Sequence, residues 1–394
     1  MSTPSGRRPS LQLVFLFGHM ANDWCPASLW LLIPAIGLAL DLQPSQLGLL
    51  ISIHAFGAAL AYFPAGVIAD RTRNQGRLLL MTFWWVGIGY AVASFAPGFW
   101  SLALLLAVAG MGDAVWHPIA TGVLVRQIPD RRGQTLGIHA VGGTLAEVLS
   151  PLLVGLLLTI LDWRSTLLVA TLPAILMGLA FIWYAQSIPR ATHKRIGRSD
   201  LIELKRTWSS SKGLALIAAI STYNMALIAL MTITPLFLQR EIKFSTGITG
   251  ILFAAAMLFG AIGQPWVGRL SDTAGRHGVF IAGSILGLTT AIVATLPLAA
   301  GWISASLILS MGVLVAIRSG VLAMAVDFSG QREATTLGFV FMVMDGVGAL
   351  GAVLAGLVGD FQLRYAFLLA AALSIASIIA MLLFYRLQRL PLLR

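Results

Sequence analysis

The sequence has little charge and almost no cysteine. Only 10% of its 394 residues are Asp, Glu, Lys or Arg, whereas a soluble domain carries about 25%. The single cysteine, Cys25, cannot form an internal disulfide. These shortages exclude an ordinary water-soluble domain and a secreted fold held by disulfides. Because 58% of the residues are hydrophobic, we expect the chain to be solvated mainly by membrane lipid.

Motifs of nucleotide-driven chemistry are also absent. The sequence contains no GxxxxGK[ST] phosphate-binding loop and no dinucleotide fingerprint between a strand and a helix. It has no polar stretch long enough to form a soluble catalytic domain. We therefore expect that the chain is not an enzyme, that it holds no cofactor, and that an ion gradient drives any work it performs.

Long apolar runs fill most of the sequence. A helix needs about 20 apolar residues to cross the hydrocarbon core, and twelve stretches meet this requirement. The sequence therefore predicts an all-α integral membrane protein with twelve spans. These spans are 11–40, 45–70, 77–97, 99–125, 134–161 and 164–187, followed by 212–240, 245–270, 278–300, 301–328, 333–360 and 363–388.

The chain repeats itself with a spacing of about 200 residues. The equivalent pairs are Gly66 and Gly268, Asp70 and Asp272, Arg164 and Arg364, Pro34 and Pro235, and Asn22 and Asn224. Two like halves related by an axis along the membrane normal are typical of one class of secondary transporters. We expect two pseudo-symmetric six-helix lobes, 1–187 and 212–394, joined by a linker, 188–211, that forms a short amphipathic helix at the membrane surface.

Basic residues gather in alternate loops. Of the 26 Lys and Arg residues, Arg318 lies inside a span and only Arg164, Arg240, Lys243 and Arg364 fall on one side of the predicted membrane. The remainder fall on the other side, which the positive-inside rule assigns to the cytoplasm together with both termini and the linker. The net charge of +11 therefore reflects topology in a bacterial inner membrane. We expect no nucleic-acid partner, because no folded basic domain remains.

Two short loops carry a family resemblance. The second copy reads Gly268, Asp272, Gly275, Arg276 and His277, and the first reads Gly66, Asp70 and Arg71, with Arg73 where the second has glycine. These loops resemble the signature of the major facilitator superfamily. The resemblance implies a cytoplasmic gate formed by Gly66, Asp70, Arg71, Gly268, Asp272 and Arg276. A carboxylate beside a helix end and an arginine is also an ion-pair latch on physical grounds.

Two further strings carry a narrower resemblance. GHMANDW at residues 18–24 and GMGDAVWHP at residues 110–118 resemble the fosmidomycin-resistance branch of bacterial drug exporters. The resemblance favours efflux. The chain departs from that branch at Ile119, where the branch commonly has an acidic residue, so no coupling role is carried over to this position.

Polar residues share helix faces in the first and fourth spans. His19, Asn22 and Asp23 lie three or four residues apart, and Asp113 and His117 are four apart. A charge at the bilayer centre costs about 2.5–3.5 kcal/mol, so these groups should face the interior of the bundle. An imidazole beside a carboxylate can relay a proton. The predicted proton-coupling residues are His19, Asp23, Asp113, His117 and Glu147. Helix–helix hydrogen bonds for His19, Asn22 and His139, and a metal shell of His19, Asp23, Asp113 and His117, remain open.

The second half contributes a permanent cation in a span. Arg318 is the repeat equivalent of His117 and needs a partner, either Asp345, Asp113, Glu147 or an anionic substrate. Asp327 is better placed for a latch near the inner end. The predicted substrate-binding residues are Asn22, Trp116, His117, Arg318, Asp345 and Tyr223.

Together these patterns predict a secondary active transporter that works by alternating access as a monomer in lipid. The leading interpretation is proton-coupled antiport that exports a small drug-like or anionic organic compound. Three alternatives remain: a proton-coupled symporter that imports an organic acid, a divalent metal transporter, and a non-transporting membrane sensor or scaffold.

Overall fold

The computed structural model describes residues 10–128, 132–189, 198–329 and 333–389, and these ranges are almost entirely α-helical. The helices before the linker are α1 Leu11–Ala39, α2 Pro44–Arg71, α3 Gln75–Ala93, α4 Phe99–Gln127, α5 Arg132–Leu157, α6 Trp163–Ala170 and α7 Leu172–Ala185. Those that follow are α8 Arg198–Trp208, α9 Ser211–Arg240, α10 Thr246–Ala274, α11 Arg276–Val293, α12 Ala300–Ser329, α13 Glu333–Gly359 and α14 Tyr365–Arg389.

Within the described ranges, eleven helical segments are long and apolar enough to cross a membrane, with α6 and α7 counted as one segment, Trp163–Ala185. The twelfth expected span is α1. It has 29 residues, but His19, Asn22 and Asp23 in its middle lower its hydropathy. The prediction of an all-α membrane protein is confirmed, and each expected span overlaps a helix. The polar residues of the first span therefore keep its mean hydropathy below that of the other spans.

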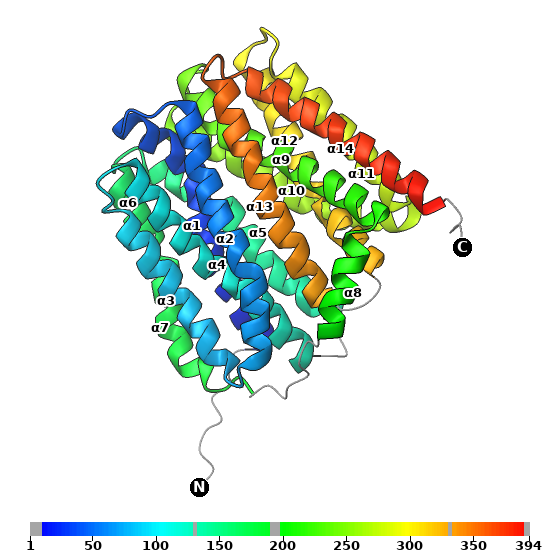
Figure 1. The fold of residues 1–394 in the computed structure, drawn as a ribbon. Helices are drawn as coiled ribbons and strands as arrows, with labels where there is room; N and C mark the ends of the chain where they lie inside the picture. The colour runs from blue at the N-terminus through cyan, green and yellow to red at the C-terminus, as the bar shows by residue number, and fades with distance from the viewer. Residues whose placement is uncertain (1–9, 129–131, 190–197, 330–332, 390–394) are drawn as a thin grey trace.

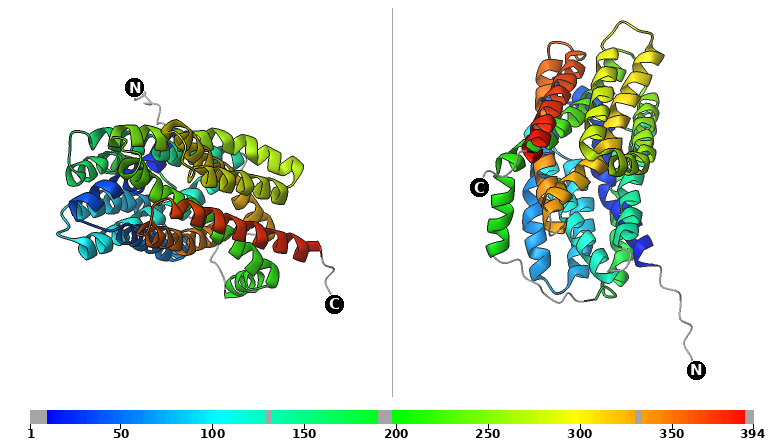
Figure 2. Two further views of the ribbon diagram at one scale, coloured as in Figure 1. Left: turned by 90° about the horizontal axis from the view of Figure 1, so that it is seen from above. Right: turned by 90° about the vertical axis from the view of Figure 1, so that its right-hand side faces the viewer.

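The two halves are built alike (Figures 1 and 2). In the first half α1 packs on α5, and α4 packs on α2 and α3. In the second half α9, the repeat equivalent of α1, packs on α13, the equivalent of α5, and α12 packs on α10 and α11. The halves meet chiefly through α2 with α13 and through α5 with α10. The repeat exchanges these two interfaces, so the halves are related by a pseudo-twofold axis.

Backbone contacts join the halves at one end of the bundle. A Cβ on Gly48 of α2 would lie 2.1 Å from the carbonyl oxygen of Ala352 in α13. On the other interface, a Cβ on Gly155 of α5 would lie 2.9 Å from the Cα of Gly250 in α10. Only glycine permits such close helix contact. We call these two contacts the glycine seam, and the end of the bundle that holds them the seam end.

The opposite end of the bundle, where α2 and α10 finish, is packed more openly. A Cβ added to Gly66 or Gly275 would meet no atom within 4 Å. Here α8 lies beside the bundle (Figure 1), and its last residue, Trp208, is buried against Phe328 of α12 and Phe339 of α13. We call this the basic end, because the arginines of the α2–α3 and α10–α11 connections lie there. The two ends therefore hold the halves differently.

Candidate functional site

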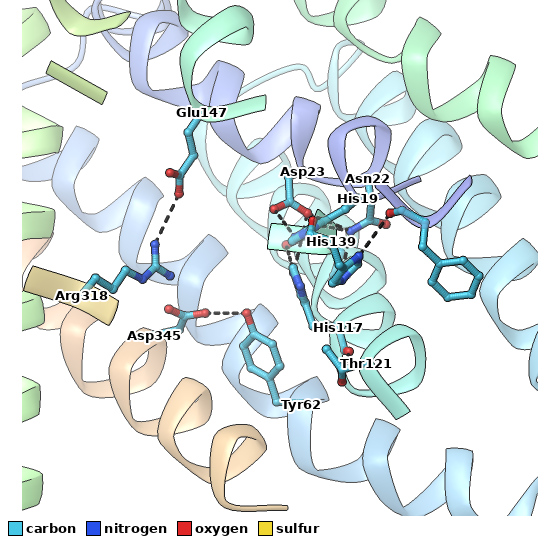
Figure 3. Close-up of polar contacts among 12 residues, drawn as sticks. His19, Asn22, Asp23, Tyr62, His117, Thr121, His139, Glu147, Arg318 and Asp345 are labelled. Carbon is cyan, nitrogen blue, oxygen red and sulfur yellow. Dashed lines mark hydrogen bonds and ion pairs between the residues drawn. The ribbon is translucent and has the colours of Figure 1, made fainter. Parts of the chain in front are cut away.

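Titratable side chains of α1 and α4 meet in the first half, and Figure 3 shows His19 and Asp23 of α1 beside His117 of α4. His19 and Asp23 share one face of α1, with 3.1 Å between His19 Nε2 and Asp23 Oδ2. Asp113 and His117 share one face of α4, and His117 Nε2 lies 3.8 Å from Asp113 Oδ2 and 3.7 Å from Asp23 Oδ1. We call His19, Asp23, Asp113 and His117 the His/Asp cluster. The sequence expectation that the two pairs approach each other agrees with this geometry.

The two imidazoles of the cluster face each other. The rings of His19 and His117 meet edge to face, with 5.1 Å between their centroids. Within each helix the carboxylate lies one turn from the histidine, and the order of the two residues is opposite in α1 and α4. Because α1 and α4 run in opposite directions, histidine lies beside histidine and both carboxylates lie on the same side of the cluster.

His139 of α5 fixes the orientation of His19. The two rings stack with 4.2 Å between centroids, and His19 Nδ1 lies 2.8 Å from the backbone carbonyl oxygen of His139. A carbonyl only accepts hydrogen bonds, so Nδ1 carries a proton. In neutral His19, Nε2 is then an acceptor that faces a carboxylate oxygen of Asp23. Two acceptors 3.1 Å apart need a shared proton or another cation between them.

Asn22 holds the second carboxylate of the cluster. Its Nδ2 donates to Asp113 Oδ1 at 2.6 Å and to the Asp113 backbone oxygen at 3.2 Å. Asn22 is fully buried. The sequence predicted Asn22 as a substrate-binding residue and left helix–helix hydrogen bonds as the alternative. In the structure its side chain orients Asp113, and its contacts are of the helix–helix kind.

Two polar contacts cross between the halves beside the cluster. Arg318 of α12 lies 3.4 Å from Glu147 of α5, measured from Nη1 to Oε1. Tyr62 of α2 donates to Asp345 Oδ2 of α13 at 2.8 Å. Of the three carboxylates that the sequence offered to Arg318, the structure selects Glu147. The side chains of Arg318 and Glu147 are 33% and 31% exposed, so neither is fully enclosed by protein.

Two predicted substrate-binding aromatics are buried away from any free surface in this conformation. Trp116 is fully buried and packs on Phe15 and Phe83, with ring centroids 5.7 and 4.8 Å apart. Tyr223 is also buried, and its hydroxyl donates to the backbone oxygen of Leu314. The structure thus places both in helix packing, because each ring already fills the space between neighbouring helices.

Sequence reasoning missed Tyr62 and Phe341. Their rings stack with 5.8 Å between centroids, and the Tyr62 ring lies 6.0 Å from that of His117. Tyr62 therefore links the cluster to Asp345 in the other half. The sequence carried no signal for this link. The extensive pairing of α2 with α13 places Tyr62 opposite Asp345, and only the folded chain reveals that pairing.

The predicted gate residues lie at the basic end. Arg276 Nε contacts Asp327 Oδ2 at 2.6 Å, and Arg276 Nη2 contacts Asp272 Oδ1 at 3.3 Å. All three belong to the second half, where Gly268 lies one turn before Asp272. Gly66 lies near the end of α2, where an added Cβ would meet no atom within 4 Å. The side chains of Asp70 and Arg71 lie outside the described residues.

Comparisons with known sequences agree on one family. The sequence model of the Major Facilitator Superfamily matches residues 15–352. A putative metabolite transport protein of Haemophilus influenzae is 27% identical over 368 residues, covering 87% of this chain and 86% of that protein. A hexuronate transporter of Bacillus subtilis is 23% identical and covers 96% of this chain and 94% of that protein. A probable sugar efflux transporter of Helicobacter pylori is 27% identical and covers 66% of each chain.

Solved structures agree on the fold. A bacterial homologue of the human lysosomal transporter Spinster, inward-facing and unoccupied, superimposes with a TM-score of 0.78 at 18% identity, covering 96% of both chains. The nucleoside transporter NupG superimposes with a TM-score of 0.76 at 14% identity, covering 96% of this chain and all of that chain. At this identity the likeness concerns the arrangement of helices alone.

Proposed function

The chain belongs to the major facilitator superfamily and is a multi-pass membrane transporter, and from this premise we propose that it carries a small organic anion together with protons. Alternating access would expose the mid-membrane site first at the basic end and then at the seam end. Members of this family are transporters, and we assign no enzyme activity to the chain.

The pair of Arg318 and Glu147 carries the proposal. Arg318 is a permanent cation whose guanidinium suits a carboxylate ligand. In this structure Glu147 occupies it. Protonation of Glu147 would release Arg318 for a substrate carboxylate, so that proton and anion bind together. This linkage favours co-transport of the two, because each ligand removes the competitor of the other.

The names of relatives support a polar, carboxylated substrate. The Bacillus subtilis relative is named for hexuronate, a sugar acid, and a carboxylate on a polar ring would suit Arg318 on one side and the His/Asp cluster on the other. The substrate class that we propose is therefore a small hydroxylated or cyclic carboxylate.

Proton-coupled export is the second candidate. A neutral or cationic substrate would compete with protons for Asp23 and Asp113 rather than bind with them, and this competition gives antiport. The Helicobacter pylori relative is named as a probable sugar efflux transporter, which favours export of a polar compound. Export by antiport was also the leading interpretation of the sequence.

The orientation follows from the charge distribution. Arg164, Arg240, Lys243 and Arg364 are the basic residues near the seam end, whereas the basic end holds most of the others. We propose that the basic end and both termini face the cytoplasm of a bacterial cell, by the positive-inside rule. The structure would then have its halves in contact on the outer side.

The test is transport by purified protein in liposomes of known orientation. We expect a sugar acid to enter with protons and the uncharged sugar of the same size not to enter. Arg318→Ala should weaken binding of the acid about 10- to 150-fold, because a hydrogen-bonded charge pair contributes about 1.5–3 kcal/mol. Glu147→Gln should keep binding but abolish its dependence on protons.

Arg389→Ala is the matched control, since Arg389 lies in the last turn of α14, outside both the site and the gate. If protons moved across the liposome membrane in the direction opposite to the substrate, the result would favour proton-coupled export over co-transport. Unchanged acid binding in Arg318→Ala, with the protein folded, would overturn the anion site.

A further inference from the structure

The His/Asp cluster has the composition and spacing of a metal-binding site. Side-chain ligand atoms of His19, Asp23 and His117 all lie within 4.8 Å of one another, and the Asp113 carboxylate lies 3.8 Å from His117. We propose that the cluster binds one divalent transition-metal ion, with these three residues as ligands and Asp113 as the fourth. The proposal goes beyond transport of an organic anion and does not depend on it.

The helix geometry suits chelation. Each helix supplies one histidine and one aspartate a single turn apart, and side chains from facing helices are the usual source of metal sites in bundles. Bonds of about 2.0–2.2 Å from a tetrahedral ion place neighbouring ligand atoms about 3.3–3.6 Å apart. The observed separations, 3.1 Å from His19 to Asp23 Oδ2 and 3.7 Å from His117 to Asp23 Oδ1, bracket that range. Because they involve different carboxylate oxygens, the side chains would have to move for one oxygen of Asp23 to bind an ion together with both histidines.

The outer partners of the cluster match those of established metal sites. A ligating histidine generally donates its second ring N–H to a carbonyl or carboxylate, and ligating carboxylates are themselves hydrogen-bonded. His19 Nδ1 has this contact with the His139 carbonyl at 2.8 Å, which leaves Nε2 as the ligand atom. Asn22 donates to Asp113 Oδ1 at 2.6 Å, which leaves Oδ2 available to an ion.

The charge of the cluster also favours a divalent cation. With neutral imidazoles, Asp23 and Asp113 bring two negative charges to the middle of a membrane protein, where an unpaired charge is unfavourable. Arg318, the permanent cation of the site, already pairs with Glu147. The other facing carboxylate, Asp345, receives its hydrogen bond from Tyr62. One divalent ion would neutralise both carboxylates, whereas neutralisation by protons would require two protons.

The ion would act on the first half alone. All four ligands lie on α1 and α4, so the ion could bind without any movement between the halves. It would tie α1 to α4 and occupy the position of the protons. A bound ion would therefore hold α1 against α4 whichever end of the bundle is open.

The experiment measures binding directly, without substrate or gradient. The full chain is purified in detergent with an affinity tag that contains no histidine, titrated with Co²⁺, and followed by the visible absorption of the ion, with Zn²⁺ as competitor. We expect one ion per chain. We also expect proton release on binding, measured with a dye in weak buffer, because ligands must be deprotonated to bind metal.

Variants of the cluster make the test specific. Asp23→Asn and His117→Asn should each weaken Co²⁺ binding by more than the 10- to 100-fold that is typical of losing an outer partner. Asn22→Ala should weaken it by about that 10- to 100-fold. His277→Asn is the matched control, because His277 lies in α11, outside the cluster. Each variant is accepted only if its melting temperature stays near that of the parent protein.

Two outcomes would overturn the proposal. The first is the lack of saturable Co²⁺ or Zn²⁺ binding by folded parent protein at millimolar ion concentration. The second is equal binding by the parent protein, Asp23→Asn and His117→Asn. Because no transported substrate enters this experiment, its failure would leave the anion-transport proposal intact, and failure of that proposal would leave the metal site intact.

Discussion

The two halves share a backbone plan but differ in chemistry. In the first half, α1 and α4 carry Asp23 and Asp113 at mid-membrane. At the equivalent positions of the second half, α9 has Met225 and α12 has Leu314, and both are buried apolar residues. Titratable groups of the repeat are therefore concentrated in one half. The comparison shows that the fold accepts buried apolar residues at these helix positions, so helix packing alone does not require the carboxylates of the first half.

The two equivalent asparagines show the same division. Asn22 donates to the Asp113 carboxylate and backbone on α4, while Asn224 donates to the backbone oxygen of Met344 on α13 at 2.6 Å. Each buried amide ties its helix to a neighbour. In the first half the same residue type also orients a charged group. The equivalent amides thus bond to non-equivalent neighbours, α4 in the first half and α13 in the second, and only Asn22 also orients a carboxylate.

The largest expected effect removes a charge from the first half. Asp113→Asn should reduce proton-coupled transport about 100-fold or more, because a positioned proton-transfer group typically contributes 10²–10⁴-fold. Substrate binding should remain, since Arg318 is untouched. The measurement is the substrate-driven pH change in liposomes.

The matched control for this variant is Leu314→Ile at the equivalent position of the second half. It conserves volume and should cost less than about 1.5 kcal/mol of stability and leave coupling intact. If Leu314→Ile lost coupling as completely as Asp113→Asn, the division of labour between the halves would be refuted.

A smaller effect is expected at a contact that joins the halves. Tyr62→Phe removes the hydroxyl that donates to Asp345, and a hydrogen bond to a charged group contributes about 1.5–3 kcal/mol. The equilibrium should shift toward conformations in which α2 and α13 are separated. Spin or fluorescent labels placed on these two helices would report the change in distance distribution.

Tyr90→Phe sharpens this test. Tyr90 and His54 share a hydrogen bond of 2.6 Å inside the first half, so its loss should lower thermal stability without altering the distance between halves. Equal shifts for the two variants would show that Tyr62 acts through stability alone.

The smallest effect concerns a helix cap outside the spans. Asp162 accepts hydrogen bonds from the backbone and hydroxyl of Ser165 at the start of α6, and these hold the pKa of its carboxyl below the usual value, which is about 3.9. Its stabilising contribution is present above that value and is lost as pH falls through the lower folded-state pKa. Asp162→Ala should lower the melting temperature slightly at neutral pH, and the difference should shrink in acid.

Gln362 stands at the equivalent place in the second half and has no charge to titrate. Gln362→Ala should therefore change the melting temperature by an amount that does not depend on pH. A pH-dependent difference for Gln362→Ala, or a constant one for Asp162→Ala, would contradict the assignment of the cap.

The sequence predicted the spans and the His/Asp pairs because both follow from local spacing. Apolar runs of about 20 residues define helices, and a four-residue separation places Asp113 and His117 on one face whatever surrounds them. The link between Tyr62 and Asp345 depends on the register of α2 against α13, which no local pattern encodes. Trp116 was predicted in the substrate site, but its neighbours Phe15 and Phe83 bury it. The resemblance to the fosmidomycin-resistance branch stays a prediction.

The glycine seam has a consequence for the speed of the transport cycle. Where Gly48 and Gly155 meet the partner helices, backbone touches backbone. Separating such surfaces requires few side chains to change rotamer, so the activation barrier for opening should be low. The polar contacts at mid-membrane would then set the rate of conformational exchange, and the bound solute would govern turnover by breaking or making them.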